Sequence, residues 1–177
     1  VGPVLSRIFQ TPDNGYADRF KHLIEPSMSV RWLSPFDQIN NVVKFDQVDY
    51  EVGGTMTVNY GLTNRLLAKR KRGGRPGDVR TILTGAISQS YYTNTQAAQF
   101  DLNYQSGSAS KFSNLAIDIN GVPADHFSAR FHTELHPDLK RPLLYSLSGV
   151  YDARKAQITA GWRKRRVIPG LPGYEAN

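Results

Sequence analysis

Cysteine is absent from this chain of 177 residues. Its absence excludes disulfide frameworks, thiol nucleophiles and the usual cysteine-based zinc modules. Long apolar runs are absent too, because no hydrophobic run exceeds about three residues, whereas a transmembrane helix needs about 20 in succession. An α-helical membrane protein is therefore excluded. A strand-built membrane protein is not, because its apolar residues alternate with polar ones.

A leader segment is also absent from the first residues. The chain starts with Val1, Gly2 and Pro3 instead of an initiator Met, and no basic or apolar signal region follows. We therefore expect a processed chain or an internal segment of a longer protein. Hydrophobic residues make up 40% and charged residues 21% of the chain, with a formal net charge of +7. This composition predicts one ordinary folded domain, or part of a larger one, and not a disordered tail.

What the chain does have is alternation of apolar and polar residues with a period of two, which is typical of strands with one buried and one polar face. It predicts an all-β fold, an antiparallel up-and-down meander of about eight strands that forms part of one transmembrane β-barrel domain over residues 1–177. The predicted strands are 4–9, 22–33, 54–69, 79–92, 113–121, 126–135, 142–151 and 155–166. Pro26, which lacks a ladder donor, predicts a bulge or a local break in pairing.

Charged residues well inside these segments all fall on the less apolar parity, which predicts one apolar and one polar face. In a barrel the polar face lines the lumen, where its charges are candidates to contact phosphate and sugar oxygens. The alternative is that they pair with each other across strands. These candidate lumen-facing residues are Glu25, Arg31, Arg65, Arg80, Asp118, Arg130, Glu134 and Arg163.

Strand length and connection length favour a membrane barrel over a soluble sandwich. Several segments span about ten to thirteen residues, which suits a tilted strand crossing a bilayer and exceeds the usual sandwich strand. Long predicted loops, 34–53 and 93–112, alternate with tight turns, as on the two rims of outer-membrane barrels. Aromatic residues near strand ends predict interfacial girdles. They are Trp32, Phe36, Tyr91, Tyr92, Phe112, Tyr151 and Trp162.

Two local features could carry other chemistry. The basic run from Lys69 to Arg75, like the cluster Arg163–Arg166, could bind nucleic acid phosphates, but no aromatic residues are interleaved with it, so we favour a solvated turn at a membrane surface. His132, Glu134 and His136 are suitable zinc ligands, yet no fourth ligand accompanies them, and we expect a polar lining instead of a metal site.

Catalysis is not expected. There is no G-x-S-x-G motif, and Ser128, His132 and Ser146 supply residue types of a hydrolase without a recognisable arrangement. We therefore predict no enzyme, no cofactor and no nucleic-acid partner.

Three segments together resemble a known family. Tyr16 to Pro26 contains Arg-x-x-His-x-Ile-Glu-Pro, Tyr60 to Leu67 reads YGLTNRLL, and Ile87 to Tyr92 reads ISQSYY. In order and spacing these segments resemble the C-terminal barrel region of the LptD family of lipopolysaccharide-assembly proteins, also called organic solvent tolerance proteins. The likeness extends from about Tyr16 to Arg166. The residues that match the motifs, to which we assign structural roles, are Arg19, His22, Glu25, Pro26, Arg65 and Gln89.

The resemblance implies a section of a large barrel in the cell outer membrane of Gram-negative bacteria, which inserts lipopolysaccharide into the outer leaflet. Its implied partners are lipopolysaccharide, membrane lipid, a plug lipoprotein (LptE in that family) and a periplasmic lipopolysaccharide bridge. The family's periplasmic jelly-roll, disulfide cysteines and lateral-gate strands have no counterpart in this chain. Two alternatives stay open: a complete small barrel acting as an anchor, adhesin or porin, and a soluble basic β-domain that binds nucleic acid or glycans.

Overall fold

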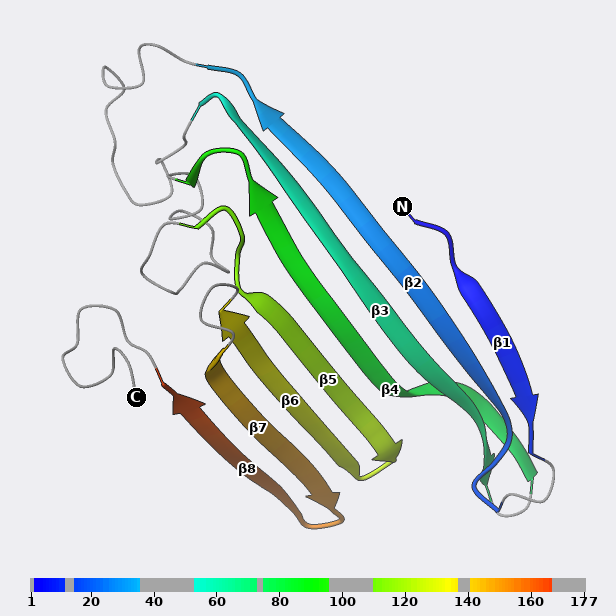
Figure 1. Cartoon of the computed structure of the whole chain (residues 1–177). Coiled ribbons are helices and arrows are strands. Elements are labelled where there is room, and N and C mark those ends of the chain that lie inside the picture. The colour runs from blue at the N-terminus through cyan, green and yellow to red at the C-terminus, as the bar shows by residue number, and fades with distance from the viewer. Residues whose placement is uncertain are drawn as a thin grey trace.

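The computed structural model describes residues 2–11, 15–35, 53–72, 75–95, 110–136 and 141–166. They form one antiparallel sheet in which each strand pairs with the next along the chain, in the order β1 to β8 (Figure 1). The predicted all-β meander of eight strands is confirmed. The strands are β1 (Leu5–Gln10), β2 (Ala17–Leu33), β3 (Thr55–Arg72), β4 (Arg75–Tyr92), β5 (Leu115–Ala124), β6 (Phe127–His136), β7 (Arg141–Ala153) and β8 (Ala156–Arg165).

The long strands reach further than the alternation indicates. β2 begins at Ala17 instead of residue 22, and the β3–β4 pairing continues to Arg72 and Arg75, through the basic run. Hydrogen bonding to a neighbouring strand extends these ends even where charged residues interrupt the apolar pattern. Much of the two predicted long loops lies outside the described residues. Within the described part of the second loop, Phe112 forms a single β-bridge with Tyr91.

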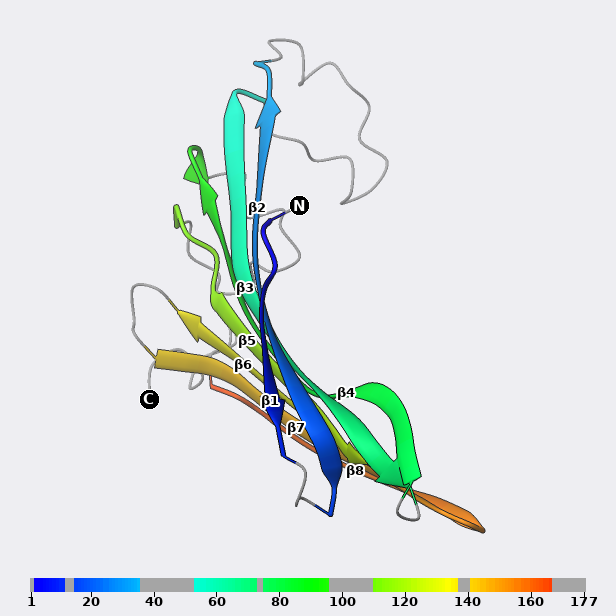
Figure 2. The same cartoon turned by 90° about the vertical axis from the view of Figure 1, so that its right-hand side faces the viewer.

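The sheet is open and consists of one layer. Seen from the side in Figure 2, it is a twisted layer with no second layer formed by the described strands. β1 and β8 form its two edges, and no pairing joins them within the described ranges. No helix in the described part of the chain is long and apolar enough to cross a membrane.

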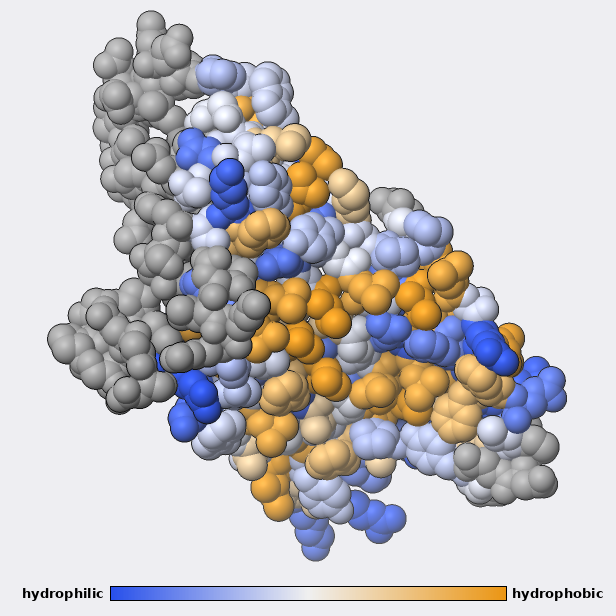
Figure 3. Space-filling view, in the orientation of Figure 1, coloured by the Kyte–Doolittle hydropathy of each residue, from blue (hydrophilic) through white to orange (hydrophobic). Residues whose placement is uncertain are grey.

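One face of the sheet is apolar across all the strands. A single register row joins seven residues on β2 to β8, which are Ile24, Asn64, Gly85, Ile119, Phe131, Leu147 and Trp162. Hydrophobic side chains gather in a band that crosses the strands in Figure 3. Many of them are exposed, for example Leu147 at 50% and Trp162 at 56%. The described residues therefore form no covering layer over this face of the kind that water-soluble sheets use to bury such residues.

Pro26 lies opposite Leu62 without any irregularity in the β2–β3 register. A bulge at Pro26 is therefore not found there. The break in pairing lies on the other side of β2, where the ladder with β1 ends at the pair Leu5 and Ile24. The register shift in β2 lies instead between Ala17 and Arg19.

Candidate functional site on the polar face

A charged network joins β5 and β6 on the polar face. The register sets Asp118 opposite His132, with Arg130 and Glu134 on either side along β6. Arg130 donates to Asp118 at 3.1 Å, and the His132 ring lies between two carboxylates, 3.1 Å from Asp118 and 3.3 Å from Glu134. Asn114 Nδ2 donates to Glu134 Oε2 at 3.0 Å. Three of the eight predicted polar-face charges are thus neighbours here, and they pair with each other across strands.

Arg163 extends the same register row, from His132 through Ser146 to β8. Within the described chain its guanidinium has no ion pair. It borders a hollow of ≈ 320 Å³, whose lining residues are Arg130, His132, Glu134, Leu144, Ser146, Ser148 and Arg163. Arg166, in the same basic cluster, lies over the Tyr145 ring at 5.7 Å. A free cation beside two serine hydroxyls can bind an anionic or hydroxyl-rich group.

A second charge pair joins β2 and β3. Arg65 Nη2 lies 3.2 Å from Glu25 Oε2, with side chains 47% and 25% exposed. Pairs this exposed contribute little to stability. Arg31 lies on the same face, opposite Thr57 and six residues beyond Glu25 on β2.

Arg80 is not on the face that sequence parity assigns to it. A register shift makes Ile82 an extra residue in β4, so that Leu67 pairs with Thr81 and Arg80 pairs with Ala68. Ala68 belongs to the apolar face, and Arg80 therefore lies there too, at the turn end of the sheet. A β-bulge reverses the parity of every residue beyond it. The guanidinium of Arg80 donates to Asp125 at 2.7 Å.

The basic run from Lys69 to Arg75 is partly neutralised where its side chains are described. Arg70 donates to the same Asp125 oxygen at 2.9 Å, and Lys71 lies 3.0 Å from Asp18. Both basic side chains are only 23% exposed. These two residues belong to the paired part of β3, so the predicted solvated turn at a membrane surface does not include them.

Two of the residues on which the sequence resemblance depends make contacts inside the sheet. His22 Nε2 lies 3.2 Å from Asn64 Oδ1 on β3. Gln89 Nε2 donates to the Ser113 carbonyl at 3.1 Å and its Oε1 accepts from the Tyr60 hydroxyl. Each side chain links neighbouring segments of the sheet.

The residues considered for metal binding or hydrolysis form no such centre in the described chain. No group of three His, Asp or Glu in the described ranges is arranged to hold a metal ion. His132 contacts Glu134, while His136 is buried at 4% exposure. Ser146 lies opposite His132, but Ser128 lies opposite Val150, and no hydrogen bond links these serines to the histidine.

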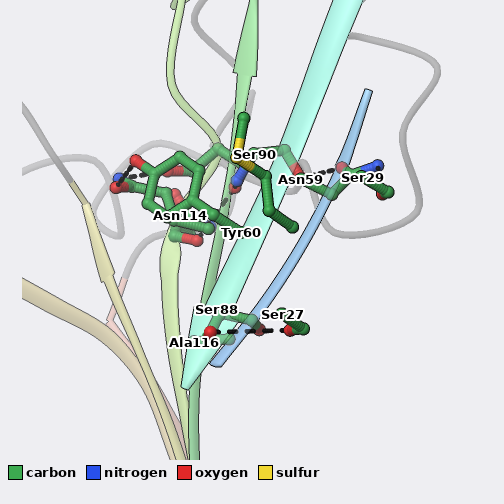
Figure 4. Close-up of a pocket in the computed structure, with 12 residues that line it drawn as sticks. Ser27, Ser29, Asn59, Tyr60, Ser88, Ser90, Asn114 and Ala116 are labelled. Carbon is green, nitrogen blue, oxygen red and sulfur yellow. Dashed lines mark hydrogen bonds between the residues drawn. The ribbon is translucent and has the colours of Figure 1, made fainter. Parts of the chain in front are cut away.

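A neutral trough, which the sequence does not predict, crosses β2, β3 and β4 and ends at segment 113–116. It has a volume of ≈ 410 Å³. Figure 4 shows Asn59 between Ser29 and Ser90, with Ser27 and Ser88 further along the trough. Asn59 Nδ2 donates to Ser29 at 3.4 Å and its Oδ1 accepts from Ser90 at 2.7 Å. The lining residues are Ser27, Met28, Ser29, Asn59, Tyr60, Gly61, Ser88, Gln89, Ser90, Ser113, Asn114 and Ala116.

One signal for this trough was present in the sequence. Serine, asparagine and glycine recur at alternate positions of three neighbouring strands, on the polar parity. The missing information was the register, which brings these positions side by side, and the return of segment 113–114 against β4, where Ser113 Oγ accepts from the Ser90 amide at 2.8 Å.

Comparisons of the chain with models of protein families, with curated proteins and with solved structures found no match in any of the three.

Proposed function

We propose that this chain is a section of the wall of an outer-membrane β-barrel that moves lipopolysaccharide to the outer leaflet. The apolar face contacts lipid and the polar face lines the lumen. The barrel proposal depends on the geometry of the apolar face. The cargo and the assembly partners, a plug lipoprotein and a periplasmic bridge, depend on the sequence resemblance described above. We assign the chain no catalytic role.

The observation that carries the barrel proposal is an oblique line of aromatic side chains on the apolar face. Both tryptophans of the chain belong to it. Trp162 on β8 is in register with Ile24, whereas Trp32 lies 32 − 24 = 8 residues further along β2. Tyr91 on β4 and Tyr145 on β7 are in register with Val30 and Pro26 respectively, so the line descends steadily from β2 to β8.

The slope of this line fits a tilted strand in a bilayer. Eight residues along β2 correspond to about 27 Å, and the six strand spacings from β2 to β8 correspond to about 29 Å. If the line marks one membrane interface, the strands tilt by about 43° from the membrane normal, within the range of about 35–45° for outer-membrane barrels. An aromatic girdle at such an interface is a general feature of these barrels.

The positions of charges on the same face agree with this orientation. Across the register, Arg80 is in line with Phe20 of β2, and Tyr91 is in line with Val30 of β2. Arg80 therefore lies 30 − 20 = 10 residues from Tyr91 along the strand direction. Along strands tilted by about 43°, ten residues correspond to about 25 Å of depth, which is the height of the apolar band in outer-membrane barrels. Arg80 then lies at the opposite interface, where a charge is tolerated.

The polar face suits a passage with weak contacts. Its carboxylates are already engaged, because Glu25 pairs with Arg65, and Asp118 and Glu134 flank His132. Paired charges bind a passing phosphate less tightly than free cations do, and conduction requires contacts that release their cargo. Arg163 and the trough hydroxyls stay available for repeated weak contacts.

Spin labelling tests the orientation. The chain has no cysteine, so single cysteines introduced at Leu147 or Ile119 on the apolar face, and at Ser148 or Asn120 on the polar face, label one site each. In the full-length protein with any other cysteines removed, folded into lipid vesicles, we expect collisions with oxygen to dominate at Leu147 and Ile119. At their neighbours Ser148 and Asn120, we expect collisions of the spin label with a water-soluble nickel chelate to dominate instead. Loss of this alternation, or a dry environment at Leu147 that neither reagent reaches, contradicts the proposal.

One observation favours a complete small barrel as second candidate. The described sheet has eight strands in an up-and-down order, which is the strand number of the smallest outer-membrane barrels. Labels on β1 and β8 distinguish the two candidates, because a closed eight-stranded barrel brings these edges within one strand spacing. In a section of a larger barrel they stay apart.

A further inference from the structure

The trough across β2, β3 and β4 owes its depth to small residues. Gly61 has no room for a side chain, since a Cβ there would lie 2.9 Å from the Ile87 carbonyl oxygen and 3.3 Å from Ser27 Oγ. Ser88 lies opposite Gly61, and Ala116 lies opposite Ser88 in the same register row. The three residues of this row therefore have small side chains or none, and the longer side chains of Asn59 and Asn114 lie beside the row.

The chemistry of this trough is that of hydroxyls and amides. No charged residue lines it, unlike the hollow of β6 to β8, which has Arg130, Glu134 and Arg163. The side chains that line its polar surface supply both donors and acceptors. An inorganic anion finds no cation there, and an apolar ligand would leave these polar groups unpaired.

Asn114 adds an acceptor that lacks a donor. It is only 2% exposed, and its Nδ2 must face Glu134 because a carboxylate accepts and cannot donate. Its Oδ1 is therefore the free end, and it has no hydrogen-bond partner in the described chain. Buried acceptors without donors are uncommon in folded proteins. Asn114 therefore forms a fixed polar wall at the end of the trough, held by its bond to Glu134.

We infer that the trough is a subsite for an uncharged saccharide. A sugar ring presents many hydroxyls that both donate and accept, which matches a surface of serines and asparagines without charge. A peptide would instead seek an unpaired strand edge, whereas the three strands that form the trough are already paired with each other. The inference rests on the proposed function, in which the polar face lines a passage for a glycolipid, and it assigns the sugar part of the cargo to β2–β4.

The test fills the trough without removing a hydrogen bond. Ala116→Leu places an apolar side chain in the trough, while Ala86→Leu makes the same change on the same face, one row away and outside the lining. Binding of maltohexaose and chitotriose to the full-length protein is measured by saturation-transfer NMR. We expect Ala116→Leu to weaken binding at least about tenfold, a change of about 1.4 kcal/mol, and Ala86→Leu to stay within about twofold of the unmodified protein.

Three outcomes would overturn the inference: equal affinity of the two leucine variants, no binding of either neutral oligosaccharide to the unmodified protein, or binding of inositol hexakisphosphate that Ala116→Leu removes. If Ala116→Leu does not fold, the test uses Ser88→Leu instead, which fills the same register row from β4. The spin-label pattern at Leu147 and Ser148 is measured independently. If it alternates while no sugar binds, only the subsite is refuted, and the barrel proposal stands.

Discussion

On the apolar face, polar side chains within the band are few and each has a local partner. Asn64 contacts His22, and the Thr133 hydroxyl donates to the Leu144 carbonyl at 2.9 Å. On the polar face, charges stand in the middle of the strands, and pairs such as Asp118 and Arg130 keep a large exposed surface. The same backbone thus has one face that avoids unsatisfied polar groups and another that presents them. This difference is expected when lipid covers the first face and water the second.

The largest test of this contrast places one cation on each face. We expect Ile119→Arg to destabilise the protein in lipid vesicles by about 2–4 kcal/mol. Ile119 is in register with Ile24, about four residues from the point where the aromatic line crosses β5, so the charge lies near the middle of the apolar band. The control variant Ala86→Arg lies on the polar face opposite Asp118 and should change the free energy of unfolding by less than about 0.5 kcal/mol. Urea titration of the folded protein measures both. Equal effects would show that the two faces have the same environment.

A smaller difference in stability is expected between the removal of two carboxylates on the polar face, Glu134 and Glu25. Glu134 is only 13% exposed at its side chain and accepts from Asn114, so Glu134→Ala should cost about 1–3 kcal/mol by leaving buried groups unpaired. Glu25→Ala makes the same change at an exposed pair, since Arg65 is 47% exposed, and should cost less than about 1 kcal/mol. Urea unfolding under identical conditions compares them. A larger loss for Glu25→Ala would mean that burial does not set the importance of these charges.

The existence of the strands and most face assignments were predictable, because a period of two is a local property of the sequence. Arg65, Arg130 and Arg163 lie on the polar face as parity predicts. Arg80 does not, because the extra residue Ile82 arises from pairing with β3, and no pattern within β4 alone reveals it.

The trough illustrates the same limit. Its walls come from three strands whose serines and asparagines are individually unremarkable polar-parity residues. Only the register sets Ser27 beside Gly61 and Gly61 beside Ser88. The charged network was partly predictable, because His132 and Glu134 share a strand, but their contact with Asp118 depends on the β5–β6 register. Side-chain patterns therefore determine faces, whereas sites depend on register between strands.

The smallest expected effect concerns the polar pair within the apolar face. His22 and Asn64 are 3.2 Å apart at Nε2 and Oδ1, on adjacent strands. A double-mutant cycle with His22→Phe and Asn64→Leu isolates their interaction. His22 lies 32 − 22 = 10 residues below Trp32 on β2, so it is at the interface opposite the aromatic line, and the coupling energy should not exceed about 0.6 kcal/mol, the average for hydrogen bonds between polar side chains in bilayers. Unfolding free energies in lipid vesicles give the four corners of the cycle. A coupling energy well above about 1.7 kcal/mol would show a pair that water does not reach, and it would contradict the interfacial position of His22.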